Sequence, residues 1–303
     1  MAQLSRRQFV ASLSAIPATL VMTSMTKAID PIQRTGPAHI KLSLAAYSFH
    51  RHMALRENRA PAMTMDQFAE FAAGLGLDAI EPTSYYFADT SESALAAFRA
   101  KCTRLGLDIS GTAVGNDFCK PAGEALNKEI DSVKQWIDRA VILGAKTIRI
   151  FAGSVPRGDT EENARRRCIE AIETVSAYAG KFGILLALEN HGGITSTAEQ
   201  LLAIVQAVQS PWFGVNLDTG NFHTADPYQD LAKIAPYAVV VQVKTEVQPK
   251  GAKKQPADFR RILSILREAG FRGYASLEYE AAEDPKTAVP RAIEELRKAL
   301  RGS

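Results

Sequence analysis

ILLALENHGGITSTAEQLLAIVQAVQSPWFGVNLDTGN, residues 184–221, contains two short apolar runs that are separated by a longer amphipathic stretch. The first run, 184–190, ends in Glu-Asn, and the second, 213–218, ends in Asp. Bounded apolar runs of this length are typical of buried strands, and apolar residues at helical spacing lie between them. A strand, a helix and a second strand in this order predict a parallel pair of strands.

The same alternation extends over most of the chain. Candidate strands occupy 40–49, 77–83, 107–114, 145–152, 184–190, 213–218, 238–244 and 274–280. The stretches between them carry helical patterns, and glycine follows several of these helices at the position that favours a left-handed cap. Eight strand–helix units that close on themselves form a barrel. The sequence therefore predicts an α/β fold with a single (β/α)8 TIM barrel over residues 40–303.

The first 28 residues have the composition of an export signal. Arg6 and Arg7 precede a weakly apolar run from Phe9 to Met25, and small residues follow as far as Ala28. SRRQF resembles a twin-arginine signal, which predicts a periplasmic or otherwise exported protein. The run is too short and too polar for a comfortable membrane span, so we expect no stable span once the signal is removed. A basic disordered tail and a retained anchor are the alternatives, and 29–39 is interpreted as a linker.

Charge and cysteine content restrict the partners. The formal charge of +3 equals the charge of Arg6, Arg7 and Lys27, so the remainder of the chain is neutral. A neutral body gives no sign of the basic face that nucleic-acid binding requires, and we expect a small-molecule partner. The three cysteines lack the spacing of a metal site and are predicted to be buried thiols, although one disulfide is not excluded. Homo-oligomerisation is left open.

Polar residues stand at the ends of the last four predicted strands, where the active site of such a barrel lies. They are Glu189, Asp218, Gln242 and Glu278. Carboxylates in apolar strands are costly to bury unless they are paired or bind a metal. Three carboxylates and one amide form an all-oxygen set, which suits one divalent ion, Mn²⁺ or Mg²⁺ rather than Co²⁺ or Zn²⁺. The alternative is that the acids form salt bridges with basic residues of the barrel mouth such as Lys244 and Arg149.

Further polar residues near the strand ends are candidates for binding the substrate. Lys244 lies two residues after Gln242 and therefore shares its strand face. The candidates are His191, Asn221, His223, Lys244, His50 and Glu81. Tyr47, Phe49, Phe118 and Phe151 are expected in the core or in the wall of a pocket, and the basic segment 250–254 is expected to be a solvated turn.

LALENHGG, VNLDTGN, VQVK and LEYE resemble motifs of the xylose-isomerase-like barrels, the sugar phosphate isomerase/epimerase group, as do ISGTAVGNDF and AAYSF. The resemblance implies a metal held by Glu, Asp, His and Glu from the last four strands. Matched to this chain, these positions are Glu189, Asp218, Gln242 and Glu278, so glutamine stands where the family commonly has histidine. The resemblance also implies that Glu189 and Glu278 are the catalytic acid/base pair.

The resulting functional hypothesis is a metal-dependent isomerase or epimerase of a keto-sugar. A cation stabilises the enediolate that forms when a proton next to a carbonyl is removed, and a carboxylate on each face moves the proton. A lyase or hydrolase of 3-keto-glycosides, or an inosose-type dehydratase, would use the same site. A sugar-binding barrel without turnover is a third possibility. The DNA-repair endonuclease branch is disfavoured, because it needs more histidines than the five in this chain.

Overall fold

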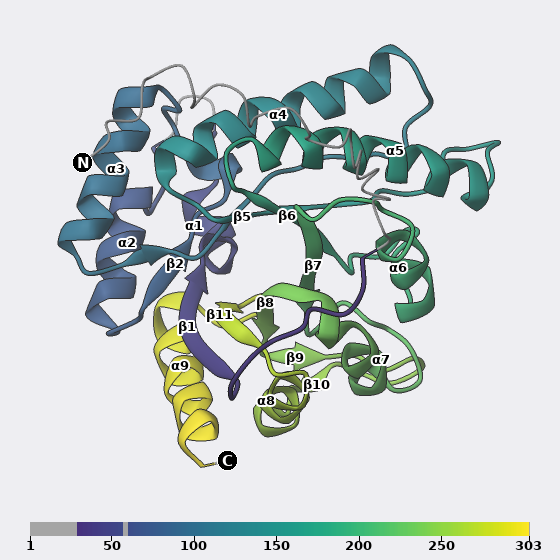
Figure 1. The fold of residues 1–303 in the computed structure, drawn as a ribbon. Helices are drawn as coiled ribbons and strands as arrows, with labels where there is room; N and C mark the ends of the chain where they lie inside the picture. Colours follow the sequence, from purple (N-terminus) through teal and green to yellow (C-terminus); the bar gives the residue numbers. More distant parts are fainter. Residues whose placement is uncertain (1–28, 57–59, 303) are drawn as a thin grey trace, which may run out of the picture.

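The computed structural model describes residues 29–56 and 60–302. Nine parallel strands surround a central axis and helices cover them on the outside (Figure 1). The strands are β1 (His39–Ala45), β2 (Ala79–Glu81), β3 (Asp108–Ile109), β4 (Thr112–Ala113), β5 (Thr147–Ile150), β6 (Leu185–Glu189), β7 (Phe213–Asp218), β8 (Ala238–Lys244) and β11 (Arg272–Glu278). Their order in the sheet is β3-β2-β1-β11-β8-β7-β6-β5-β4.

The barrel closes through a strand that is divided into two parts. β3 pairs with β2, and β4, two residues further along the chain, pairs with β5. A bridge between Thr83 and Ala113 joins the two edges again. Gly111 lies at the division, where a Cβ atom would come within 2.3 Å of the Thr147 hydroxyl oxygen. The eight predicted strands are therefore confirmed as one TIM barrel, with the third strand bent at this close approach.

In the described part of the chain, eight helices of eight or more residues follow the strands. They are α2 (Met65–Gly74), α3 (Glu92–Arg104), α4 (Glu124–Leu143), α5 (Glu161–Gly180), α6 (Ala198–Val205), α7 (Pro227–Ile234), α8 (Phe259–Glu268) and α9 (Pro285–Arg301). Short helices η1 (Ala46–Phe49), α1 (His50–Met53), η2 (Ser84–Tyr86) and η3 (Ala235–Tyr237) lie in the loops, and β9 (Glu246–Val247) pairs with β10 (Gln255–Pro256) as a separate antiparallel ribbon.

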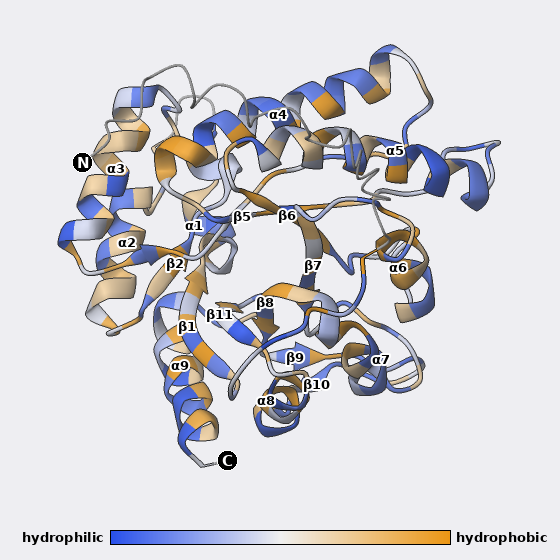
Figure 2. Ribbon diagram, viewed as in Figure 1, coloured by the Kyte–Doolittle hydropathy of each residue, from blue (hydrophilic) through white to orange (hydrophobic). Residues whose placement is uncertain are grey.

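Local sequence explains where the helices begin and which face they bury. α5 and α6 start after Thr160 and Thr197, whose hydroxyls accept hydrogen bonds from backbone N–H groups of the first turn. α4 buries a stripe that includes Val133, Trp136 and Ile137. In Figure 2 the strands β5 and β6 are mainly orange, whereas α4 and α5 carry both colours, as expected for helices with one buried face.

The segment before the first strand packs on the N-terminal end of the barrel. The Ile32 N–H donates to the Pro236 carbonyl at 3.0 Å, and the Arg34 guanidinium donates to the Ala269 carbonyl at 3.4 Å. These contacts lie at the opposite end from the strand termini that carry the acids. The predicted signal, 1–28, lies outside the described residues.

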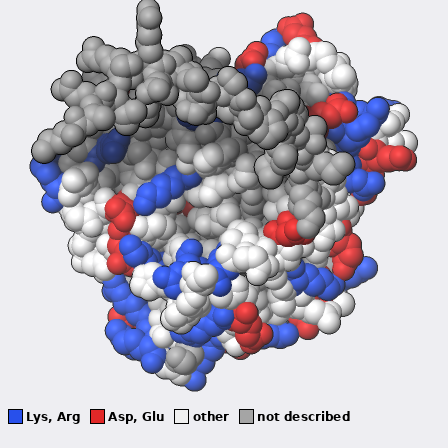
Figure 3. Space-filling model, viewed as in Figure 1, with Lys and Arg blue, Asp and Glu red and all other residues white. Residues whose placement is uncertain are grey.

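The surface and the cysteines agree with the composition. In Figure 3 basic and acidic side chains are interspersed on the visible described surface, with basic ones more frequent near α8 and α9. Cys102, Cys119 and Cys168 are buried free thiols, as expected. Among the described residues no helix is both long and apolar enough to cross a membrane.

Candidate active site

Parallel pairing brings the predicted acids to one end of the barrel. Asp218 lies opposite Gln242 in the β7–β8 pair, and Glu278 lies opposite Lys244 in the β8–β11 pair. Glu189, the last residue of β6, pairs in register with Asn216 of β7. All of these side chains are buried. Adjacent C-terminal strand ends therefore concentrate three carboxylates in the barrel mouth.

A cavity of about 190 Å³ opens above these residues. We call it the central cavity, and it is lined by Tyr47, Tyr85, Arg149, Phe151, Glu189, His191, Lys244, Glu278 and Glu280. Tyr47 and Phe151 thus belong to the pocket wall, whereas Phe49 and Phe118 are completely buried in the core. Aromatic faces next to carboxylates suit a ligand that has apolar C–H faces and polar edges, such as a sugar.

Lys244 places an ammonium group among the acids. Its Nζ contacts the carboxylate of Glu278 and lies 3.1 Å from Glu280 Oε1 and 3.4 Å from Asp218 Oδ2. Burial alone would lower the pKa of Lys244, but the charges of Asp218, Glu278 and Glu280 outweigh it and raise the pKa well above its usual value. Lys244 is therefore a fixed positive charge at neutral pH.

Arg149 supplies the second positive charge and holds Glu189. Its Nε lies 3.0 Å from Glu189 Oε2, and its guanidinium stacks on the Phe151 ring at 3.9 Å. The other oxygen of Glu189 accepts a hydrogen bond of 2.8 Å from the Asn221 amide. Burial raises the pKa of Glu189 well above its usual value, and the attraction of Arg149 offsets only part of this effect. Burial thus favours the protonated form of Glu189, whereas the ion pair with Arg149 favours the carboxylate.

Gln242 connects two other buried side chains. Its Oε1 accepts a hydrogen bond of 2.6 Å from Asn216 Nδ2, and its Nε2 donates one of 2.7 Å to Glu81 Oε1. Burial, with a further contribution from the charge of Glu278, raises the pKa of Glu81 to about 7. Both ends of the Gln242 amide are therefore engaged in a buried Asn216–Gln242–Glu81 chain.

The predicted four-oxygen metal set does not fit this arrangement. The amide oxygen of Gln242 is engaged by Asn216, and the Lys244 ammonium stands between Asp218 and Glu278. Within 29–56 and 60–302, no group of three or more His, Cys, Asp or Glu side chains is arranged to hold a metal ion. The contacts agree with the alternative reading of the sequence, in which the acids form salt bridges with Lys244 and Arg149.

The predicted histidines are distributed over three places. His191 lines the central cavity with its ring 4.3 Å from that of Phe151, and burial lowers its pKa. His50 lies outside that cavity, because the turn after β1 directs its Nδ1 to the Tyr47 carbonyl at 3.0 Å. His223 is also outside it, and its Nδ1 is 3.1 Å from the Gln248 carbonyl oxygen.

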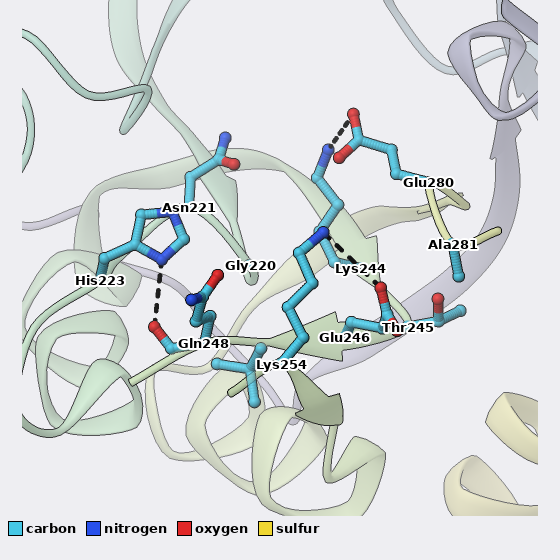
Figure 4. Close-up of a pocket in the computed structure, with 11 residues that line it drawn as sticks. Gly220, Asn221, His223, Lys244, Thr245, Glu246, Gln248, Lys254, Glu280 and Ala281 are labelled. Carbon is cyan, nitrogen blue, oxygen red and sulfur yellow. Dashed lines mark hydrogen bonds and ion pairs between the residues drawn. The ribbon is translucent and has the colours of Figure 1, made fainter. Parts of the chain in front are cut away.

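A second cavity, of about 150 Å³, adjoins the central one. We call it the side cavity, and its lining includes Asn221, His223, Lys244, Gln248, Lys254 and Glu280 (Figure 4). Lys244 and Glu280 line both cavities. Of the substrate-binding residues predicted from the sequence, His191, Lys244, Asn221 and His223 line one or both of these spaces, whereas His50 and Glu81 line neither.

Residues 69–299 match the family model of the xylose isomerase-like TIM barrels. The chain belongs to this family. No curated protein matches the sequence significantly.

Solved structures share the fold of this xylose isomerase-like barrel at low sequence identity. A xylose isomerase domain protein from Planctomyces limnophilus is 19% identical with a TM-score of 0.65, covering 89% of this chain and 100% of that one. D-psicose 3-epimerase from Clostridium cellulolyticum H10, solved with D-tagatose, is 13% identical with a TM-score of 0.69, covering 86% and 99%. The IolI protein, solved with a zinc atom, is 22% identical with a TM-score of 0.67, covering 86% and 96%.

Several residues of the mouth of this xylose isomerase-like barrel were not assigned a site role from the sequence. Glu280, Tyr85 and Asn216 belong to this group, and Arg149 was considered only as a salt-bridge partner. Asn216 and Glu280 each stand two residues from a predicted acid, Asp218 and Glu278, so period-two alternation places them on the same strand face. That signal was present in VNLD and LEYE, but Tyr85 lies in a loop where no periodicity applies.

Proposed function

We propose that this barrel is a sugar isomerase or epimerase that moves a proton on a carbon next to a carbonyl group. The observation that carries the proposal is the pair of carboxylates, Glu189 and Glu278, that line one small cavity together with two fixed positive charges. Their strands, β6 and β11, are separated in the sheet by β7 and β8, so the two acids approach the cavity from different sides. The solved epimerase structure with D-tagatose supports a keto-sugar as the ligand.

The contacts of the two acids suggest different roles. Glu278 faces the Lys244 ammonium in an ion pair that uses its carboxylate form, which suits a base that removes the proton. Glu189 has a raised pKa and suits the acid that returns a proton to the other carbon or to the other face. Lys244 and Arg149 are placed to stabilise the negative charge of the enediolate oxygen. Glu280 is partly exposed, so its contact with Lys244 is the one that a substrate oxygen can replace.

In a second version of this proposal, the enzyme uses a divalent metal ion, and Mn²⁺ or Mg²⁺ is preferred to Co²⁺ or Zn²⁺. It is supported by Asp218 Oδ2, which is buried and has the Lys244 ammonium at 3.4 Å but no hydrogen bond, and by the excess of acids over bases in the mouth. The zinc atom in the IolI structure is a further reason to test it. Binding would require Lys244 to leave Asp218 and Glu278.

Proton NMR in D2O tests the reaction. The purified chain is incubated with ketoses and with 3-keto-glucosides, after treatment with EDTA or with added Mn²⁺. We expect deuterium to enter the carbon next to the carbonyl, and Glu278→Gln to abolish this exchange because it removes the base. Glu189→Gln should instead abolish formation of the isomer or epimer, because it removes the acid that returns a proton to the other carbon or the other face. Release of an alcohol or a sugar in the same spectra would identify elimination instead. Exchange that is unaffected in both variants would contradict the assignment of the acids.

Export through the twin-arginine route is a separate proposal, since the segment that carries it lies outside the described residues. It is supported by the sequence SRRQF at 5–9 and by the apolar run that follows. We expect Arg6→Lys combined with Arg7→Lys to leave the protein in the cytoplasm, because the receptor recognises the arginine pair. Cell fractionation followed by immunoblotting measures this, and unchanged periplasmic recovery would show that another signal is used.

A further inference from the structure

We propose that the side cavity is a second sugar-binding subsite, so that the substrate is a glycosylated keto-sugar rather than a free monosaccharide. The reacting unit would occupy the central cavity and the second unit the side cavity. This inference rests on the proposed function for the identity of the reacting unit. It stands on three properties of the side cavity, which are its connection to the central cavity, its balanced charge and the hairpin that encloses it.

The connection is made by one ion pair. Lys244 and Glu280, 3.1 Å apart, line both cavities and separate them. Figure 4 shows this pair on one side of the side cavity, with His223 and Gln248 on the other side. A ligand that replaces the exposed Glu280 contact can therefore extend from one cavity into the other. Volumes of about 190 and 150 Å³ make the two spaces similar in size.

The charges in the side cavity are paired with one another. Lys254 lies 3.7 Å from Glu246, and Lys244 is paired with the acids around it (Figure 4). The lining has no surplus of positive charge to attract a phosphate or a carboxylate. It does present both hydrogen-bond donors and acceptors, including the amides of Asn221 and Gln248. A neutral ligand with many hydroxyl groups matches this lining better than an anion.

One part of the wall of the side cavity is formed by an element that is not part of the barrel sheet. β9 and β10 form a two-stranded ribbon after β8, and Glu246, Val247 and Lys254 of this segment face the cavity. The Lys250 N–H donates to the Thr224 carbonyl at 2.8 Å, which joins the ribbon to the loop after β7. Residues 250–254 are all exposed, as expected for a solvated turn, and Lys254 of this turn also lines the space beside the catalytic acids.

Calorimetric titration of the full chain with matched ketoses tests the subsite. Fructose is compared with three fructose derivatives that carry a second sugar at different positions, namely turanose, lactulose and isomaltulose. We expect at least one of them to bind about tenfold more tightly than fructose. Lys254→Ala and Gln248→Ala should reduce that advantage. Lys253→Ala is the matched control, because Lys253 is exposed on the same ribbon and does not line the cavity.

The readouts separate the failure of this inference from the failure of the proposed function. Equal affinity for fructose and all three derivatives, or no binding of any of them, would overturn the subsite. If a derivative binds more tightly than fructose but no sugar shows deuterium exchange, the subsite is supported and the proposed function is rejected. An advantage that persists in Lys254→Ala and Gln248→Ala would place the second sugar elsewhere and overturn the assignment of the side cavity.

Discussion

Lys244 determines the electrostatic balance of the barrel mouth, because its ammonium group contacts Asp218, Glu278 and Glu280 within a buried site. We expect Lys244→Met to lower the free energy of unfolding by about 3–5 kcal/mol, since it leaves buried carboxylates without their cation. Added Mn²⁺ should raise the stability of this variant more than that of the parent, because the carboxylates are then free to bind a cation. Urea denaturation with Mn²⁺ or EDTA measures both effects. The exposed variant Lys253→Met is the control, and equal stability of Lys244→Met and the parent would refute the ion-pair role.

Gln242 is the position where the sequence and the structure suggest different roles. If Gln242 is a metal ligand, its replacement by alanine would lower the metal content of the protein without a large effect on folding. If Gln242 instead joins Asn216 to Glu81, the same replacement leaves two buried polar groups without partners, which costs about 1–3 kcal/mol each. We therefore expect Gln242→Ala to lower the urea midpoint and to leave metal content unchanged by mass spectrometry. A stable variant that has lost metal would restore the ligand role.

The loops after β5 and β6 pack closely against each other at the barrel mouth. Gly193, in the loop after β6, has a φ of +52°, and a Cβ atom there would lie 2.1 Å from the Gly153 carbonyl oxygen in the loop after β5. We expect Gly193→Ala to displace the loop that carries His191 and to slow deuterium exchange by up to about 100-fold.

Gly183→Ala is the matched control for this substitution. Gly183 has a φ of +71° but no atom within 4 Å of the added Cβ, so only the backbone strain of about 1 kcal/mol remains. Thermal denaturation and exchange rates are compared for the two variants. Equal effects of the two substitutions on both measurements would show that the contact between the loops has no role.

The elements also show how much could be predicted from the sequence. Short bounded apolar runs identified all eight barrel strands, because burial on both faces favours a continuous run of apolar residues. The bend at Gly111 was not predicted, since its cause is the approach of Thr147 from a strand that is distant in sequence. The β9–β10 ribbon was missed because two-residue strands carry no periodic signal. The acids were located correctly, but their partners depend on side-chain contacts between strands.

For the whole molecule, the buried acids of the mouth make stability depend on pH. The pKa of Glu81 and that of Asp218 are each raised to about 7, mainly by burial. The charge of Glu278 raises the pKa of Glu81 further, and the charge of Arg149 opposes this effect. Between the ordinary carboxyl pKa and pH 7 the folded state therefore binds more protons than the unfolded state. The free energy of unfolding must then fall as pH rises through this range, and the loss is complete above pH 7.

Glu81→Gln isolates the contribution of one of these acids. The amide resembles the protonated carboxyl group and can still accept the hydrogen bond from the Gln242 amide, but it does not titrate. We expect the parent to lose more stability than the variant between pH 4.5 and pH 8, by on the order of 3 kcal/mol. Urea denaturation at several pH values measures the difference. Glu124→Gln is the control with the same change in charge, because Glu124 is exposed on α4 and its pH profile should follow that of the parent. If the stability of the parent and that of Glu81→Gln change in parallel with pH, Glu81 is already ionised throughout this range in the folded protein. The Asn216–Gln242–Glu81 chain would then contain a buried negative charge and no carboxyl proton.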